Sequence, residues 1–398
     1  MNKRLIFHVD VNNAFLSWTA TDLLKKGHKV DIRTIPSVIG GDEESRHGIV
    51  LAKSPIAKKY GIATAETLYM ARKKCPNIQV FPGDMKLYKE MSKKLHDYLL
   101  EYTPDVEYAS IDECYMDMTN TTYLYKNIID CAYKINKEVK EKFGFTVNVG
   151  IANNKLCAKM ASDFEKPDKV HTLFKDEIQE KLWLLPVGEL FMIGRKTASK
   201  LKELNINTVG DLANSDINYL KKHFKSFANV MWEFANGIDD SNVESETFKS
   251  KSISASWTLP KDTDDINELK RIIRSQADEV GRTLRKQKEY ATVIAVTFKT
   301  ADFINYSKQM KIPTPTDLSE EIYIYAEEIL VKAWNNEKIR NIGIRLSGFT
   351  DKKTEQLSIF GDFRDSSDEK VQQTIDKIND KYKHNTIIAA SLLETKNK

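Results

Sequence analysis

The segment FHVDVNNAF, residues 7–15, carries a short apolar run into the start of a helical pattern. Residues 6–9 are apolar apart from one histidine and end at Asp10, which predicts a buried β-strand. Residues 12–25 follow with the spacing of a helix. A single acid after a strand is usually an ordinary turn or cap residue, so Asp10 indicates chemistry only together with other acids.

Two adjacent acids lie in a second apolar segment. Residues 106–118, VEYASIDECYMDM, alternate like a strand or a hairpin around Asp112 and Glu113. Side chains on a regular strand alternate faces, so both acids reach one ion only if the strand bends or bulges there. Like charges held close together repel and need a cation.

Three carboxylates from separate strands would form a hard-oxygen site suited to Mg²⁺ or Mn²⁺. Two such ions, about 3.5–4 Å apart, can clamp an in-line phosphoryl displacement. The residues of this chain that could form the site are Asp10, Asp112 and Glu113. From the residues alone, a two-metal phosphoryl-transfer site and ordinary structural acids both remain open.

The chain has 398 residues, which predicts two to four domains. Up to residue 167, the patterns βα, β-hairpin and αβαβα predict an α+β sheet covered by helices and interrupted by a small insertion. Residues 168–242 are helical throughout by pattern, and residues 243–252 are polar like a linker. Residues 253–350 have the βαββαβ order of a split-βαβ sandwich, and a charged tail with one amphipathic helical pattern follows.

The composition is that of a soluble globular protein, with 41% hydrophobic and 30% charged residues. No stretch approaches the roughly 18 uninterrupted apolar residues of a membrane span, and the apolar run before Asp10 is too short for a signal peptide. We therefore expect a cytoplasmic protein without membrane contact. The four cysteines have neither metal-ligand nor disulfide spacing. A net charge of +4 neither requires nor excludes a nucleic-acid partner.

Three motifs together resemble the Y-family DNA polymerases, in particular the DinB/UmuC-like group of bacterial translesion enzymes. The segment FHVDVNNAF is similar to the first motif of the family, and YASIDECYMDM, with an intact SIDE tetrad at residues 110–113, is similar to the second. The third is VNVGIANNKLCAKMASDFEKP, residues 147–167. The resemblance covers roughly residues 5–350, and a UvrX-like UV-damage repair protein is the subgroup that we expect.

The fold implied by the resemblance is an α+β multidomain right hand of palm, fingers and thumb, with a βαββαβ little-finger domain. The implied domains are a palm at 1–15 and 82–167, fingers at 16–81, a thumb with a helix-hairpin-helix at 168–242, a linker at 243–252, a little finger at 253–350 and a tail at 351–398.

The resemblance also implies the roles of the acids. Asp10 and Asp112 would be metal ligands, Glu113 would be a ligand or a catalytic acid, and Val11 would offer its backbone carbonyl. The implied cofactor is a pair of Mg²⁺ ions, for which Mn²⁺ can substitute. Phe15 matches the steric gate that excludes a 2′-hydroxyl, although a core aromatic at a helix start is the structural alternative.

The segment VLAKSPIAKKYGI, residues 50–62, resembles the fingers motif that holds the triphosphate. Lys58 would contact phosphate, as would Lys166 of the third motif, and a surface lysine is the alternative for Lys58. Pro55 departs from the family, in which many members have tyrosine there. The substrate site implied in full is Val11, Asn12, Asn13, Ala14, Phe15, Ser54, Lys58 and Lys166.

The segment FMIGRKTASKLKELNINTVGDLA, residues 191–213, resembles the helix-hairpin-helix of the thumb. Its tight turn would present N–H groups to a DNA phosphate at Ile193, Gly194 and Lys196. Met192 stands where the family usually has the first glycine of this turn. Without the resemblance, the segment is simply an amphipathic helix pair.

The segment QLSIF, residues 356–360, resembles the peptide that docks such polymerases on a sliding clamp. Its anchors would be Gln356, Leu357, Ile359 and Phe360. The implied partners are primer–template DNA, a dNTP, the clamp and, for the UmuC-like branch, a recombinase filament. We expect a monomer.

The function implied is template-directed DNA synthesis of low fidelity, opposite and past damaged bases and without proofreading. Three other classes are weighed against it. Residues 40–44, GGDEE, resemble the signature of a diguanylate cyclase, but they lie inside the predicted fingers hairpin and leave the rest of the chain unexplained. A catalytically silent scaffold conflicts with the presence of all three carboxylates, and a two-metal nuclease has no further acidic cluster or catalytic histidine to support it.

Overall fold

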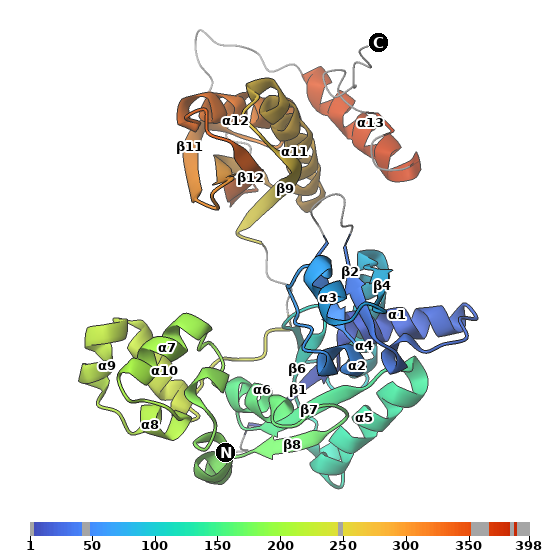
Figure 1. Cartoon of the computed structure of the whole chain (residues 1–398), viewed down its shortest axis with the longest axis vertical. Helices are drawn as coiled ribbons and strands as arrows, with labels where there is room; N and C mark the ends of the chain where they lie inside the picture. Colours follow the sequence, from blue (N-terminus) through green and yellow to red (C-terminus); the bar gives the residue numbers. More distant parts are fainter. Residues whose placement is uncertain (1–3, 42–47, 246–249, 352–365, 383–385, 388–398) are drawn as a thin grey trace. The chain divides into compact units, whose positions relative to one another are not determined.

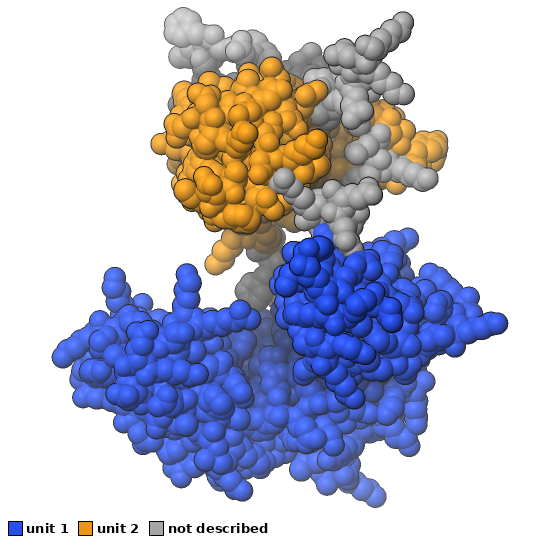
Figure 2. All heavy atoms as spheres, viewed as in Figure 1, with its two compact units in different colours: residues 1–43, 47–247 blue, residues 44–46, 248–398 orange. Residues whose placement is uncertain are grey.

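A computed structural model describes residues 4–41, 48–245, 250–351, 366–382 and 386–387 of the chain. The chain divides into two compact units, shown in Figure 2. Unit 1 comprises residues 1–43 and 47–247, and unit 2 comprises residues 44–46 and 248–398. Each unit has its own hydrophobic core.

The centre of unit 1 is a five-stranded sheet with the strand order β5-β6-β1-β7-β8 (Figure 1). Strand β1 is antiparallel to both of its neighbours, and β8 is parallel to β7. The strands are β1 (Ile6–Val11), β5 (Val106–Tyr108), β6 (Glu113–Asp117), β7 (Val147–Ala152) and β8 (Val170–Leu173). This sheet carries the acids that the sequence singles out.

Two predictions about this sheet need correction, and one open alternative is decided. Strand β1 does not end before Asp10 but continues to Val11, because Asp10 pairs with both neighbouring strands. Of the two alternatives expected around Asp112, a strand or a hairpin, the hairpin is confirmed by the antiparallel pairing of β5 with β6. The prediction that residues 168–242 are helical throughout is wrong, since β8 extends the sheet by parallel pairing to β7.

The two faces of β1 have different partners because its side chains alternate. Phe7, Val9 and Val11 point into a core that is shared with helices α1 (Ala14–Lys25), α4 (Met85–Leu99) and α5 (Ile128–Phe143). The even-numbered residues, which include His8 and Asp10, face helix α6 (Lys155–Asp163), as the contacts of their side chains show. Asp10 therefore lies between the sheet and α6.

Helix α6 lies very close to β7, and Gly150 makes this approach feasible. A Cβ atom on Gly150 would lie 1.9 Å from the carbonyl oxygen of Ala158 and 2.5 Å from the amide nitrogen of Ser162. Both of these atoms belong to the backbone of α6, so no side-chain movement could relieve the clash. The absence of a side chain at Gly150 thus allows the backbone of α6 to pack directly against β7.

A smaller sheet of order β3-β2-β4 lies between α1 and α4 in the sequence. It contains β2 (Ser37–Gly40), β3 (Val50–Lys53) and β4 (Gln79–Pro82), with the short helices α2 (Pro55–Lys59) and α3 (Leu68–Lys74) and the 3₁₀ turn η1 (Ile32–Thr34). The predicted hairpin is confirmed by the antiparallel pairing of β2 with β3. Strand β4, which pairs parallel to β2, was not predicted.

The rest of unit 1 is helical. It comprises α7 (Arg195–Glu203), α8 (Val209–Ala213), α9 (Ile217–Phe224) and α10 (Phe227–Ala235), preceded by the short turns η3 (Lys175–Glu177), η4 (Ile178–Leu182) and η5 (Val187–Glu189). These elements share one hydrophobic cluster with α6. The cluster joins this helical part to α6 and also includes Ile6, Tyr115 and Ala152 of the sheet.

Unit 2 is a four-stranded antiparallel sheet of order β11-β10-β12-β9. It comprises β9 (Ser252–Thr263), α11 (Ile266–Gln287), β10 (Tyr290–Thr300), β11 (Asn305–Thr316), α12 (Ser319–Ala333) and β12 (Ile339–Thr350). The predicted βαββαβ order is confirmed. Strand β12 lies between β9 and β10, so the first βαβ unit is split as expected.

The predicted tail helix is also confirmed, as α13 (Ser366–Tyr382). Its Asp376 accepts two hydrogen bonds from Arg285 of α11, at 2.6 and 3.0 Å. Asp380 pairs with Lys286 of the same helix at 2.9 Å. The predicted clamp peptide, residues 356–360, lies outside the described residues.

Candidate active site

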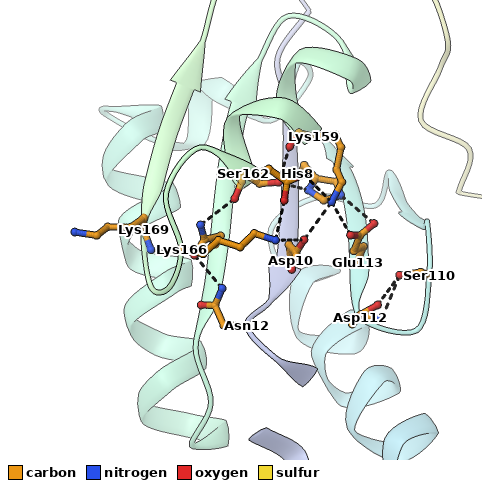
Figure 3. Close-up of polar contacts among 12 residues, drawn as sticks. His8, Asp10, Asn12, Ser110, Asp112, Glu113, Lys159, Ser162, Lys166 and Lys169 are labelled. Carbon is orange, nitrogen blue, oxygen red and sulfur yellow. Dashed lines mark hydrogen bonds and ion pairs between the residues drawn. The ribbon is translucent and has the colours of Figure 1, made fainter. Parts of the chain in front are cut away.

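Asp10 and Glu113 are directly paired residues on the neighbouring strands β1 and β6. One ammonium group bridges them, since Nζ of Lys159 lies 3.2 Å from Oδ2 of Asp10 and 2.6 Å from Oε1 of Glu113 (Figure 3). Asp10 is buried, with 5% of its surface exposed. The structure thus places two of the three predicted acids on one shared cation.

A second lysine reaches Asp10 from the loop after α6. Nζ of Lys166 lies 2.8 Å from Oδ2 of Asp10 and 2.7 Å from Oδ1 of Asp163. Burial raises the pKa of Asp10, and this effect prevails over the charges of Lys166 and Lys159, which lower it. Lys166, predicted from the third motif, therefore lies beside the candidate acids.

The other oxygen of Glu113 faces His8, whose Nε2 lies 3.7 Å from Oε2. The Nδ1 atom of His8 is 2.8 Å from Oγ of Ser162, and Ser162 in turn donates to the carbonyl oxygen of Lys159. Burial lowers the pKa of His8. Burial alone would raise the pKa of Glu113, but the close contacts with His8 and Lys159 outweigh it and hold that pKa well below its usual range.

Asp112 is not brought together with the other two acids. It lies in the turn between β5 and β6, and its Oδ1 accepts a hydrogen bond of 2.7 Å from Oγ of Ser110, so its carboxylate points away from Asp10 (Figure 3). The turn itself is tied to β1, because the amide of Val11 donates to the carbonyl of Asp112 at 3.0 Å. A side-chain rotation away from Ser110 would free this carboxylate.

The donor chemistry fits a hard divalent cation. Asp10 and Glu113 already share a cationic contact, and carboxylate oxygens are the ligands that Mg²⁺ and Mn²⁺ prefer. Across the part of the chain that the structure describes, no three His, Cys, Asp or Glu side chains are already grouped to hold a metal. Asp112, the third predicted acid, is hydrogen-bonded to Ser110 instead.

The asparagines that follow Val11 make contacts within the protein. Asn12 is buried, donates to Asn148 at 3.0 Å and accepts from Thr146 at 2.9 Å. Asn13 has a left-handed backbone with φ of 52° and donates to the carbonyl of Lys53 at 2.7 Å. Ala14, also predicted as a substrate contact, is buried at the start of α1. Asn13 therefore connects the end of β1 to β3.

Phe15 lies on the first turn of α1 and is half-buried. Its ring stacks on that of Tyr88 from α4, with the ring centroids 4.5 Å apart. The phenyl ring is thus supported from one side by a buried aromatic residue.

The predicted fingers residues occupy two different environments. Ser54 is fully buried and caps α2 through a 3.0 Å hydrogen bond from the amide of Ala57, while its hydroxyl donates to the carbonyl of Ile35. Lys58 is exposed on α2, and Pro55 is the first residue of that helix. Ser54 therefore orients the helix that presents Lys58, and its own hydroxyl has partners within the protein.

The predicted turn of the helical part directly precedes α7. Gly194 is the N-cap residue of α7, Ile193 is buried and Lys196 is exposed. Met192 has a left-handed backbone, with φ of 71°, and its side chain is 58% exposed. Methionine therefore occupies a left-handed backbone conformation, which glycine adopts without steric cost.

His8, Lys159, Ser162 and Asp163 were not among the residues predicted from the sequence. One signal could have indicated Lys159. It is the single charged residue in the run LCAKMAS, residues 156–162, and a lysine is rarely buried without a carboxylate partner. The proximity of His8 to Glu113 could not be inferred, because it depends on the register between β1 and β6.

The sequence matches the impB/mucB/samB family over residues 9–163 and the C-terminal domain of that family over residues 250–359. DNA polymerase IV of Clostridium acetobutylicum is 47% identical over 395 residues, which cover 99% of this chain and 100% of the relative. DNA polymerase IV 1 of Bacillus subtilis is 34% identical over 382 residues, which cover 95% of this chain and 91% of the relative.

Two solved structures are similar. A Y-family DNA polymerase chimera, Dbh-Dpo4(243-245)-Dbh, has a TM-score of 0.75 and 26% identity and covers 87% of this chain and 100% of its own. A Dbh ternary complex with partially disordered substrates has a TM-score of 0.61 and 27% identity and covers 86% of this chain and 98% of its own.

The fold and the site define a DNA-directed DNA polymerase, as the sequence predicts. The chain belongs to the impB/mucB/samB family, the Y-family DNA polymerases, and to its DinB-like group. The predicted multidomain α+β fold is confirmed, and the expected UvrX-like subgroup stays a prediction. Among the described residues, no helix is long and apolar enough to cross a membrane.

Proposed function

We propose that this polymerase synthesises DNA with low fidelity opposite and past damaged bases, using two Mg²⁺ ions and no proofreading. The observation that carries the proposal is the pairing of Asp10 with Glu113 on adjacent strands, with Asp112 in the adjoining turn. The relatives that are named DNA polymerase IV support the class of reaction. Mn²⁺ would substitute for Mg²⁺, because it accepts the same oxygen ligands.

In this proposal, Asp10, Glu113 and Asp112 hold the ions once the Asp112 side chain has left Ser110. The metals would lower the pKa of the attacking 3′-hydroxyl and stabilise the charge on the leaving pyrophosphate. Lys166 and Lys58 supply cations for the triphosphate, and one face of the Phe15 ring lies under the sugar and excludes a 2′-hydroxyl. Val11 contributes its backbone carbonyl as a ligand.

We assign the palm to residues 1–15 and 82–173, the fingers to 16–81, the thumb to 174–242 and the little finger to 253–350, which moves the expected end of the palm from residue 167. Strand β8 belongs to the palm sheet, so the palm in this proposal continues to Leu173. Primer–template DNA and a dNTP are the substrates, and the turn at Ile193, Gly194 and Lys196 contacts a DNA phosphate. Because the substrate is DNA, the cytoplasm is the proposed location.

Two protein partners belong to the proposal. The peptide of Gln356, Leu357, Ile359 and Phe360 would dock on a sliding clamp, and a recombinase filament would be a further partner of a monomeric enzyme. Pull-down of the clamp by the full chain, compared with a chain in which Leu357 and Phe360 are both alanine, tests the first of these. Equal capture by both chains would remove the peptide from this role.

The test of the main proposal is primer extension with single dNTPs and Mg²⁺ on an undamaged template and on one that carries a damaged base. We expect Asp112→Ala to abolish extension and to leave primer–template binding, measured by fluorescence anisotropy, nearly unchanged. Asp130→Asn, which alters an exposed acid on α5, is the control. Binding without extension by the wild-type chain would favour the silent scaffold, and extension by Asp112→Ala would refute the metal assignment.

A further inference from the structure

Lys159 makes more contacts with acids than any other lysine of the candidate site. Its ammonium group lies within 3.2 Å of Asp10, Glu113 and Asp163, and 10% of its side chain is exposed. Residues 156–162 of α6 are all buried, so the backbone of the helix fixes the position of Lys159. The close approach of α6 to β7 at Gly150 holds that backbone in place.

Lys159 and Lys166 hold different positions. Lys166 contacts Asp10 and Asp163, and 37% of its side chain is exposed. Lys159 alone of the two contacts Glu113, and it therefore spans the pair of carboxylates between β1 and β6. A phosphate group can approach the more exposed Lys166, whereas Lys159 faces the carboxylates from within the protein.

We propose that Lys159 is a positioning residue that competes with a divalent cation for the Asp10–Glu113 pair. It holds the two carboxylates close together and lowers the affinity of the pair for metal. The inference rests on the proposed function and adds a residue that adjusts the metal affinity of the same site. An ammonium group within 3.2 Å of both acids offsets their negative charge, so it repels a dication at the same oxygens.

Lys159 lies between three carboxylates, with Nζ 3.2 Å from Asp10, 2.6 Å from Glu113 and 3.2 Å from Asp163. Without this cation, two acids on adjacent strands would repel each other, and Glu113 would keep only its contact with His8.

The proposal predicts two effects of opposite sign. Removing the ammonium group should increase the affinity of the carboxylate pair for a divalent cation, because the competitor is lost. The same change should slow nucleotide addition, because Glu113 loses its 2.6 Å contact and its position becomes less defined. A purely structural lysine would give no gain in metal affinity.

The experiment is a titration of the full chain with Mn²⁺ in the absence of DNA and nucleotide, followed by the electron paramagnetic resonance signal of free Mn²⁺. We expect Lys159→Met to lower the dissociation constant by about tenfold, a change of roughly 1.4 kcal/mol. Lys159→Arg, which keeps the charge, should bind Mn²⁺ like the wild type. Single-turnover nucleotide addition should be slower in Lys159→Met, with little change in the KM for the dNTP.

Lys155→Met is the matched control. Lys155 lies one turn earlier on α6, is 15% exposed and forms a similarly buried ion pair with Glu107 at 2.6 Å. It contacts neither Asp10 nor Glu113 in the described structure. We expect Lys155→Met to leave the Mn²⁺ affinity unchanged, which separates a contact effect from a general change in net charge.

Mn²⁺ binding by Lys159→Met that equals or falls below that of the wild type would overturn the proposal, and so would an equal gain in Lys155→Met. Melting temperatures show whether Lys159→Met is folded, and Lys159→Gln replaces it in the titration if it is not. Asp10→Asn tests the site itself. If that variant binds Mn²⁺ as tightly as the wild type, the proposed metal site fails independently of Lys159.

Discussion

The ring of Phe15 lies against the ring of Tyr88, with centroids 4.5 Å apart and an angle of 9° between their planes. Tyr88 is fully buried, and its hydroxyl lies 2.9 Å from Oγ1 of Thr19, one turn further along the helix that carries Phe15. Trp18 packs against both rings. This contact fixes the position of the proposed steric gate, since an aromatic ring that is supported on one side cannot retreat from a 2′-hydroxyl.

Tyr88→Leu should therefore weaken sugar selection. We expect the preference for dNTP over rNTP to fall several-fold, and to fall further in Phe15→Ala, because Leu fills the space but gives a flat ring no stacking partner. Single-nucleotide incorporation with matched dNTP and rNTP measures this preference. Tyr98→Leu, a change in another buried tyrosine of α4, is the control. Unchanged selection in both Tyr88→Leu and Phe15→Ala would remove Phe15 from the gate.

Met192→Gly should relieve backbone strain in the proposed DNA-binding turn. A left-handed backbone costs a residue with a side chain about 1–2 kcal/mol, which glycine would not lose. Glycine also has more conformational freedom in the unfolded chain, and this cancels part of the stabilisation. We expect a net stabilisation of about 0.5 kcal/mol in denaturant unfolding, and tighter primer–template binding by anisotropy. Met192→Ala keeps the strain and should show neither gain. Weaker DNA binding by Met192→Gly would contradict the proposed role of this turn.

Gly150→Ala should displace α6 from β7. The new Cβ would overlap backbone atoms of Ala158 and Ser162, so the helix must move and carry Lys159 with it. We expect a loss of more than about 2 kcal/mol in the free energy of unfolding, together with a large loss of extension activity. Gly83→Ala is the control, because its Cβ would meet its nearest neighbour at an ordinary 3.5 Å. Wild-type stability in Gly150→Ala would show that α6 can move at little cost.

Because of Asp211, the stability of the helical part of unit 1 should depend on pH in the acidic range. Its carboxylate accepts hydrogen bonds from the amides of Thr208 and Asn207, and these lower its pKa from the ordinary value of 3.8. A depressed folded-state pKa gives a stabilisation that is complete above the unfolded-state pKa and is lost as the pH falls through the folded-state pKa.

Because Asp211 is exposed and its charge is screened by solvent, Asp211→Ala should cost about 0.5 kcal/mol at pH 7 and progressively less below about pH 4. Thermal unfolding of both chains between these pH values measures the difference. The physical cause of this lower stability is the loss of the capping box that Asp211 forms with Thr208. A penalty that is the same at low and neutral pH would show that the charge of Asp211 contributes nothing.

Local sequence was sufficient for much of the fold. The helices α1, α4 and α5 and the βαββαβ order of unit 2 follow from the spacing of apolar residues and from stop signals such as Gly144, which caps α5 with φ of 80°. Strands β4 and β8 were missed. Each has four residues and pairs in parallel, β8 with a strand 21 positions earlier and β4 with one 42 positions earlier, so neither has a tight turn to mark it.

The sequence by itself determined which acids are present, their place at the end of β1 and around the β5–β6 turn, and the family to which they belong. Tertiary structure alone decided how those acids meet. Asp10 faces Glu113 because residues about a hundred positions apart pair in one register, Lys159 joins them because Gly150 admits α6, and Asp112 turns to Ser110. Pairing register and helix depth are set by packing between distant segments, which no local pattern of residues specifies.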